Sequence, residues 1–231
     1  MNTVFPPAPS VTVPVVGTNA QFPVHRIYCV GRNYVDHAQE MGHTGREPPF
    51  FFMKPADAVL VAAPGCVTPL PYPGLTKNLH YEIELVVAIG TGGKNISVKQ
   101  AESHIFGYAV GLDMTRRDLQ NDMKAQGRPW CIGKGFDHSA PMGLITPKEA
   151  AGDISHAAIS LQVNNVLRQN STVEQLIWNM AETIAELSAA WELQPGDLIY
   201  SGTPAGVGAV VPGDTLKGCI SGLTDIALKV V

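Results

Sequence analysis

Apolar residues in this chain fall mostly into short runs separated by glycine, proline and polar positions, a pattern typical of β-strands joined by turns. Few helical segments separate these runs, so the pattern favours an α+β fold over a doubly wound α/β sheet. The clearest strands are predicted in the ranges 25–34, 50–55, 80–90 and 105–124. In the first range the strand ends at Gly31. In the last range it ends near Asp113, and a helix or helical turn follows.

One long helix is predicted over residues 171–191. Ser171 and Glu174 have the spacing of a capping box, in which each side chain bonds to the other residue's backbone N–H. A shorter helix after Asn33 is also predicted, with Asn33 as its cap. Apolar residues recur at helical spacing along the long segment, at Val173, Leu176, Ile177, Met180, Ile184 and Leu187.

The first 24 residues differ in composition from the rest of the chain. They are rich in proline and valine and are expected to form an extended arm that packs on the main body. The arm has no basic start and no unbroken apolar stretch, so we do not expect a signal peptide. Residues 25–231 are then expected to form a single catalytic domain.

Composition limits the classes of function. The chain has 231 residues, 45% of them apolar, and can bury a substantial core. Its net charge is −4 and its basic residues form no cluster, which argues against nucleic-acid or anionic-membrane partners. No segment approaches the ~20 apolar residues of a membrane span. The four cysteines have neither metal-ligand nor redox spacing, and we expect reduced thiols in a cytoplasmic protein.

Two carboxylates stand on one face of an otherwise apolar strand. Side chains alternate across a strand, so Glu82 and Glu84 point the same way, and Asp113 at the end of another apolar strand offers a third oxygen donor. Three carboxylates without nearby cysteine suit a hard cation such as Mg²⁺, Mn²⁺ or Ca²⁺. The alternative is that the two glutamates face solvent on an edge strand and pair with lysines.

His37 and Glu40 lie three residues apart, so on a helix they share a face. A carboxylate beside an imidazole fixes its tautomer and raises its basicity, as a general base requires. The alternative is an ordinary ion pair on the surface of a short helix.

Six blocks of the sequence, in order, resemble the signature blocks of the fumarylacetoacetate hydrolase family, and within it those of the acylpyruvate and fumarylpyruvate hydrolases. The resemblance runs from about Arg26 to the C-terminus. It implies a mixed β-sandwich roll with peripheral helices, assembled as a homodimer. The blocks are "CVGRNYVDHAQEMG", "FFMKP", "NLHYEIELVVAIG", "GYAVGLDMTRRDLQ", "PWCIGKGFD" and "GDLIYSGTPAGVG".

The resemblance also implies roles for single residues. Glu82, Glu84 and Asp113 match the metal-binding carboxylates, while His37 and Glu40 match the pair that activates water. The other matching residues are Lys134, near the metal and the developing negative charge; Arg117 and Gln120, which hold substrate oxygens; and Thr203, which contacts the substrate carboxylate.

Other matching positions carry less information. Arg32 and Lys54 lie in matching blocks as expected substrate-binding residues, with a structural ion pair as the alternative for each. Where some family members have a hydroxyl residue four positions after the lysine, this chain has His138, which puts any substrate contact there in doubt. The long N-terminal domain of larger family members is absent.

The expected activity is that of a Mg²⁺- or Mn²⁺-dependent hydrolase of 3-acylpyruvates, with fumarylpyruvate as the substrate and fumarate and pyruvate as products, late in gentisate-type aromatic breakdown. The partner is thus a small 2-oxo acid. An oxaloacetate decarboxylase or an isomerase of unsaturated dioic acids on the same site is the alternative enzyme. A non-catalytic, metal-stabilised binding protein is the alternative from another class.

Overall fold

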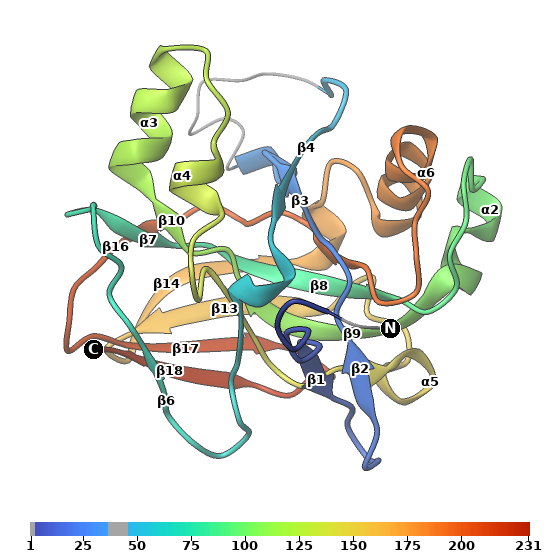
Figure 1. Ribbon diagram of the computed structural model, residues 1–231, viewed down its shortest axis with the longest axis horizontal. Helices are drawn as coiled ribbons and strands as arrows, with labels where there is room; N and C mark the ends of the chain where they lie inside the picture. Colours follow the sequence, from blue (N-terminus) through green and yellow to red (C-terminus); the bar gives the residue numbers. More distant parts are fainter. Residues whose placement is uncertain (1–2, 37–45) are drawn as a thin grey trace.

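The computed structural model describes residues 3–36 and 46–231. Its centre is an eight-stranded mixed sheet in the order β4-β3-β15-β8-β9-β11-β5, with β12 also pairing with β9 (Figure 1). Nearly all residues of β3, β8 and β9 are buried, which explains their apolar sequences. The strands are β3 (Ile27–Gly31), β4 (Phe50–Lys54), β5 (Val59–Val61), β8 (Ile83–Ile89), β9 (Ile105–Leu112), β11 (Ala140–Met142), β12 (Thr146–Pro147) and β15 (Leu198–Tyr200).

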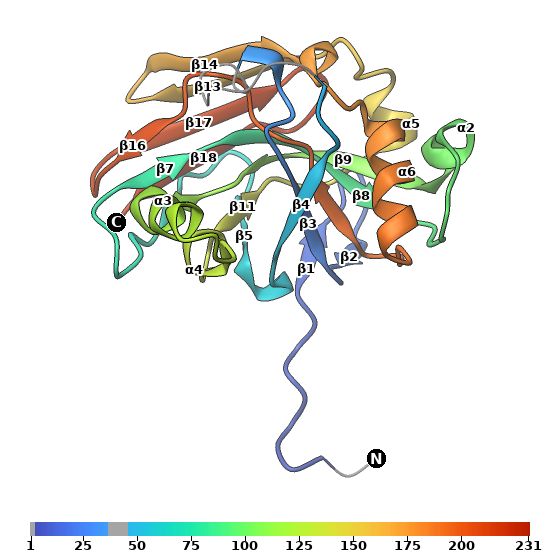
Figure 2. The same cartoon turned by 90° about the horizontal axis from the view of Figure 1, so that it is seen from above.

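A five-stranded sheet, in the order β14-β13-β17-β18-β6, packs over one face of the central sheet (Figure 2). Ile83 and Leu85 of the central sheet share a buried cluster with Leu161 and Leu228 of the second sheet. Gly218 lets the layers approach, because a Cβ there would lie 3.1 Å from the Ile83 side chain. These strands are β6 (Thr68–Leu70), β13 (Ala158–Val163), β14 (Val166–Thr172), β17 (Thr215–Ile220) and β18 (Ile226–Val230).

A small third sheet lies where the central sheet approaches the carboxylates. Its order is β10-β7-β16, with every pairing antiparallel. β7 leads into β8 and β9 leads into β10, so the two chain segments that carry the predicted carboxylates remain neighbours beyond the central sheet. The bounds are β7 (Leu79–Tyr81), β10 (Thr115–Arg116) and β16 (Gly208–Val210).

Part of the predicted N-terminal arm packs on the opposite face of the central sheet. Strands β1 (Thr12–Pro14) and β2 (Gln21–Pro23) form a hairpin. Val13 and Phe22 of this hairpin are buried in a second core cluster with residues of β3, β8 and β15. The described residues before the hairpin extend away from the body, as Figure 2 shows, and are largely exposed.

Helices lie at the periphery, which confirms the predicted α+β class. α3 and α4 lie at one end of the central sheet, and α2 and α6 lie together at the other (Figure 1). In the described part of the chain no helix is long and apolar enough to cross a membrane. The bounds are η1 (Ala56–Ala58), α2 (Val98–Ala101), η2 (Glu102–His104), α3 (Arg117–Ala125), α4 (Cys131–Lys134), α5 (Lys148–Ala151), η3 (Val173–Gln175) and α6 (Met180–Ala190).

The prediction of one helix over 171–191 is wrong in its first half. Ser171 belongs to β14, which pairs with β13 along its length, and a 3₁₀ turn follows it. The helix begins only at Met180. Asn179 and Glu182 form the capping box: Glu182 N–H donates to Asn179 Oδ1 over 3.0 Å, and Asn179 N–H donates to Glu182 Oε2 over 3.1 Å.

The side chain of Asn33 joins three parts of the chain. Its Nδ2 donates to the Trp178 and Ser201 carbonyls over 3.0 and 2.7 Å, and its Oδ1 accepts from Trp178 N–H over 2.8 Å. These bonds fix the turn after β3 against the segments before α6 and after β15. Most of the helix that Asn33 was expected to cap lies outside the described residues.

Candidate active site

Three predicted carboxylates converge at the end of the β8–β9 pair. Antiparallel pairing sets Ile83 opposite Leu112, and Asp113 N–H donates to the Glu82 carbonyl over 2.8 Å. Because side chains alternate, Glu82 and Glu84 then face the same side as Asp113. One oxygen from each of the three carboxylates lies within 4.8 Å of the others, and all three residues are buried.

Cationic side chains neutralise this cluster unevenly. Lys134 Nζ lies 2.9 Å from Glu82 Oε2 and 2.7 Å from Asp113 Oδ2. Lys54 Nζ lies 2.7 Å from the other Asp113 oxygen, and Arg117 pairs with Glu82 Oε1. Within the described residues Glu84 makes no ion pair; it accepts a 2.8 Å hydrogen bond from the Gly202 backbone N–H.

The site's electrostatics follow from this uneven pairing. Burial, and then the nearby charges of Asp113 and Glu82, raise the pKa of Glu84 well above its usual range. For Lys134, burial disfavours the charged form, but the Asp113 and Glu82 carboxylates outweigh it and its pKa is raised. The site therefore contains a permanent ammonium group and one carboxylate whose negative charge is poorly compensated.

These donors fit a hard divalent cation. They offer only carboxylate oxygens, close enough together to be shared by one ion, and Glu84 needs positive charge that its neighbours do not supply. The alternative of two solvent-facing glutamates on an edge strand is wrong, because both residues are at most 5% exposed and β8 lies inside the sheet.

Helix α3 brings two predicted substrate-binding residues to the cluster. Arg117 begins the helix and Gln120 follows one turn later, so the two share a face. Arg117 Nη1 donates to Gln120 Oε1 over 2.5 Å while its other amino group holds Glu82. Burial and then the Arg117 charge lower the pKa of the neighbouring His80 to about 4, which leaves that ring neutral at physiological pH.

Thr203 is placed by a buried glutamine that sequence reasoning missed. Gln169 of β14 donates from Nε2 to Thr203 Oγ1 and to the Pro204 carbonyl, each over 2.8 Å. Its Oε1 accepts from Ile83 N–H over 3.0 Å, which ties this arrangement to the start of β8. Because the Thr203 hydroxyl accepts a bond from Gln169, its own proton can be donated toward the pocket.

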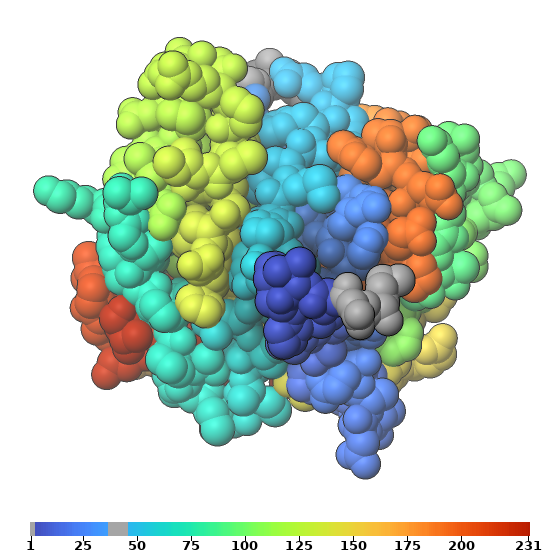
Figure 3. All heavy atoms as spheres, viewed as in Figure 1, coloured from blue at the N-terminus to red at the C-terminus, as the bar shows by residue number. Residues whose placement is uncertain are grey.

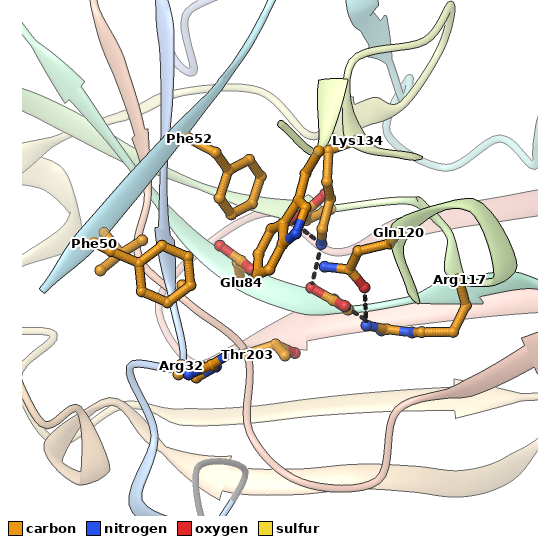
Figure 4. A pocket seen from close by; sticks show the side chains of 13 residues that line it. Arg32, Phe50, Phe52, Glu84, Arg117, Gln120, Lys134 and Thr203 are labelled. Atoms are coloured by element: carbon orange, nitrogen blue, oxygen red, sulfur yellow. Dashed lines mark hydrogen bonds and ion pairs between the residues drawn. The ribbon is translucent and has the colours of Figure 1, made fainter. Parts of the chain in front are cut away.

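The pocket around the cluster brings together most of the predicted site (Figure 4). Arg32 lines it from the turn after β3 and has a left-handed backbone (φ 56°), an uncommon conformation for a non-glycine residue. Lys54 lies behind the pocket, paired with Asp113. The predicted residues that line the pocket are Arg32, Glu82, Glu84, Asp113, Arg117, Gln120, Lys134 and Thr203.

His37 and Glu40 lie outside the described residues, so their role stays a prediction. His138 is not among the residues that line the pocket, and its backbone is also left-handed (φ 62°).

Sequence reasoning also missed residues that contact or line the site. Thr115 accepts from Lys134 Nζ over 2.7 Å and donates to Glu82 over 3.3 Å; its position two residues after Asp113 was the available signal. The aromatic residues Phe50, Phe52 and Trp130 line the pocket opposite the carboxylates, and the "FFFM" run had suggested only a strand.

The fold and the site together describe a curled two-layer β-domain with a buried triad of carboxylates that could hold a metal ion. Residues 26–231 match the family model described as "Fumarylacetoacetate (FAA) hydrolase C-terminal". The chain belongs to the fumarylacetoacetate hydrolase family, as its sequence blocks indicated.

Individual relatives agree with this family. A crystal structure of fumarylpyruvate hydrolase from Pseudomonas aeruginosa in complex with Mn²⁺ and pyruvate is 56% identical, covers 100% of this chain and 99% of its own, and superposes with a TM-score of 0.98. A fumarylpyruvate hydrolase of Ralstonia sp is 47% identical over 184 residues, 80% of this chain and 93% of its own length. A mitochondrial oxaloacetate decarboxylase of Dictyostelium discoideum is 37% identical over 207 residues, 89% of this chain and 94% of its own length.

Proposed function

We propose that this protein is a Mg²⁺- or Mn²⁺-dependent hydrolase that cleaves the C–C bond of a 3-acylpyruvate, with fumarylpyruvate as substrate and fumarate and pyruvate as products. The observation that carries the proposal is the buried triad of Glu82, Glu84 and Asp113, in which Glu84 lacks a cationic partner among the described residues. The Pseudomonas aeruginosa and Ralstonia relatives support the substrate.

The charges around the pocket suit a substrate with two carboxylates. Arg32, Arg117 and Lys134 line the pocket, and Lys54 lies directly behind it. Together with a divalent ion, Arg117, Lys134 and Lys54 alone exceed the charge of the three carboxylates. The surplus favours a dianion such as fumarylpyruvate over a neutral ligand.

Each group has a proposed task. Glu82, Glu84 and Asp113 would hold the ion, which when bound polarises the oxygens of a 2-oxo acid; Ca²⁺ also accepts such ligands. The side chains proposed to hold the substrate oxygens are Arg32, Arg117, Gln120 and Thr203. Lys54, expected among them, does not line the pocket and pairs with Asp113, which favours the alternative of a structural ion pair.

The bond changes can be assigned to the chain's own residues. His37, oriented by Glu40, would take a proton from water as its oxygen bonds to the acyl carbonyl carbon. The C–C bond then breaks, its electrons pass to the methylene carbon of the pyruvate half, and that carbon takes up the proton that His37 removed from water. The Lys134 ammonium, 2.7 Å from Asp113, can stabilise negative charge that develops beside it.

Oxaloacetate decarboxylation is a second candidate, favoured by the 37% identity to the Dictyostelium discoideum enzyme. It needs the same ion and 2-oxo acid contacts. An isomerase of unsaturated dioic acids would need no hydrolytic water, so the His37–Glu40 pair argues for hydrolysis or decarboxylation. A purely binding role is less well supported, since Lys134 and all three carboxylates are present and assembled.

The remaining expectations stay proposals. We infer a homodimer, a cytoplasmic location, and a role in gentisate-type aromatic breakdown from the resemblance of the sequence to its relatives. The division into an arm, 1–24, and one catalytic domain, 25–231, likewise stays a prediction. Four free cysteines are consistent with a reducing compartment.

A substrate panel tests the function. Pyruvate release should be measured for fumarylpyruvate, acetylpyruvate and oxaloacetate with Mg²⁺ and with Mn²⁺, and in excess chelator. We expect the highest kcat/KM for fumarylpyruvate and no activity in chelator, restored by added ion. A higher kcat/KM for oxaloacetate than for fumarylpyruvate would show that the protein is a decarboxylase and not the proposed hydrolase. Full activity in excess chelator would rule out the metal-dependent mechanism.

A further inference from the structure

Strand β4 directs two phenylalanines toward the candidate active site. Alternation along the strand places Phe50 and Phe52 on the same face as Lys54, whose ammonium reaches Asp113. Phe51 points the other way and meets Trp191 edge-on, with ring centroids 6.2 Å apart. The "FFFM" run is therefore split between a core face and a site face.

Trp130, immediately before α4, packs against both site-facing rings. Its centroid lies 5.4 Å from Phe50 in an edge-to-face arrangement and 5.8 Å from Phe52. We call these three side chains the aromatic wall. Contacts of this kind hold aromatic rings in preferred relative orientations, so the wall is a defined surface.

The aromatic wall begins at Lys134. Lys134 Nζ lies 5.0 Å from the Phe52 ring centre while it holds Glu82 and Asp113. The three aromatic residues and Lys134 line both the carboxylate pocket and an adjoining groove of about 500 Å³. Figure 3 shows the segment of β4 beside the α3 and α4 segments on this face of the molecule.

The position of Phe50 depends on a glycine. Gly31 of β3 pairs with Phe50 in the sheet register, and a Cβ at Gly31 would lie 2.1 Å from the Phe50 ring. Only glycine leaves room for the ring to lie across β3. The Arg32 guanidinium, in the turn after β3, lies 5.3 Å from the centre of the Phe50 ring. Gly31 and Arg32 thus both limit where the Phe50 ring can lie.

We propose that the aromatic wall is the binding site for the acyl half of the substrate and selects planar, conjugated acyl groups. The inference rests on the proposed function, because it takes the pyruvate half to be held at the carboxylates. The wall residues line both this pocket and the adjoining groove, which offers room for the acyl half. A conjugated acyl group presents a flat π face that aromatic rings contact well, whereas a saturated chain of equal length and charge presents a puckered one.

The test compares fumarylpyruvate with succinylpyruvate, which differ only in one C=C bond. Their kcat/KM ratio should be measured for the wild type, Trp130→Leu and Phe52→Leu. The matched control is Phe106→Leu, the same change at a partly exposed phenylalanine of β9 that packs on Phe22. We expect a wild-type preference for fumarylpyruvate that falls by about 3- to 10-fold in both wall variants, as for loss of one aromatic contact, and is unchanged in Phe106→Leu.

A second readout separates this inference from the proposed function. Oxalate, which lacks an acyl half, should bind the wall variants and the wild type within about two-fold, and this also shows that the variants fold. If the wild type cleaves fumarylpyruvate but the wall variants keep the wild-type kcat/KM ratio, the aromatic wall does not select the acyl group. If the wild type cleaves neither acylpyruvate, the proposed function itself fails.

Discussion

The uneven pairing of the three carboxylates predicts opposite effects for two similar substitutions. Glu84→Gln removes a negative charge that no cation balances within the described residues, whereas Glu82→Gln removes the partner of Arg117 and Lys134. Both variants should lose the binding of a divalent ion. Without the ion, we expect Glu84→Gln to be at least as stable as the wild type and Glu82→Gln to be clearly less stable.

The size of these effects follows from the geometry. The chosen carboxylate oxygens lie within 4.8 Å of one another, and at an effective dielectric constant of about 20 like charges at that limit repel by about 3.5 kcal/mol. Glu84 can escape this by taking up a proton, which at about pH 7.5 costs a carboxyl group about 4 kcal/mol. The gain from Glu84→Gln is therefore between zero and about 4 kcal/mol, while breaking the buried pairs of Glu82 costs about 3–5 kcal/mol.

Thermal unfolding measures the difference. In excess chelator, the Tm of Glu84→Gln should equal or exceed that of the wild type, and the Tm of Glu82→Gln should fall by at least about 6 °C for a chain of this size. Mn²⁺ at about 100 times its Kd should raise the wild-type Tm by about 5–10 °C and leave both variants almost unchanged. If Glu84→Gln lowers the chelator Tm as much as Glu82→Gln does, the argument from unequal pairing is refuted.

Three further predictions test other parts of the molecule. His37→Ala should lower kcat by about 10²–10⁴ with oxalate affinity within a few-fold of wild type, because a general base adds little to ground-state binding; near-normal turnover would place the base elsewhere. Asn33→Ala should cost about 2–4 kcal/mol in urea unfolding, since it leaves buried partners at Trp178 and Ser201 unsatisfied; a loss below about 0.5 kcal/mol would contradict this. In the native state a thiol reagent at about pH 8 should modify the exposed Cys66 and Cys131 quickly. Burial keeps Cys29 unreactive and raises the pKa of Cys219 to about 11, so rapid modification of all four cysteines would contradict this prediction.

The central part of the site could be predicted from the sequence because it depends on local geometry. The period of a strand places Glu82 and Glu84 on one face, and the end of an apolar run places Asp113 at the same edge. The order of the strands in the sheet is set by long-range pairing, which no local pattern reveals. Gln169 illustrates this limit: it lies 86 residues from Ile83, to which it bonds, and its own segment, in a hairpin, had suggested no role.

The false helix has a different cause. Val173, Leu176 and Met180 do recur at helical spacing, and the first two are buried, but Val173 begins a 3₁₀ turn and Leu176 directly follows it in extended conformation. Pairing of β14 with β13 overrides the weak preference of the segment for helix. The true start was also present in the sequence, because Asn179 and Glu182 have capping-box spacing just as Ser171 and Glu174 do. The sequence alone does not show which of these two capping boxes begins the helix, because that depends on tertiary contacts.

The same unequal pairing explains how the fold tolerates three buried carboxylates before any ion is bound. Lys134 bonds to Glu82 and Asp113 together, and Lys54 takes the remaining oxygen of Asp113, so two of the three negative charges are already neutralised. Glu84 has no ion pair within the described residues, and its pKa stays raised well above the usual range, chiefly by burial, although the Gly202 N–H and the Lys134 charge act against this. A divalent ion would relieve the penalty of that burial while entering a site whose other ligands are held in place. Ion binding should therefore need both Glu82 and Glu84, whereas the stability of the ion-free protein should need Glu82 and its cationic partners. Glu84→Gln should then lose the ion without loss of that stability, and so separates the two properties.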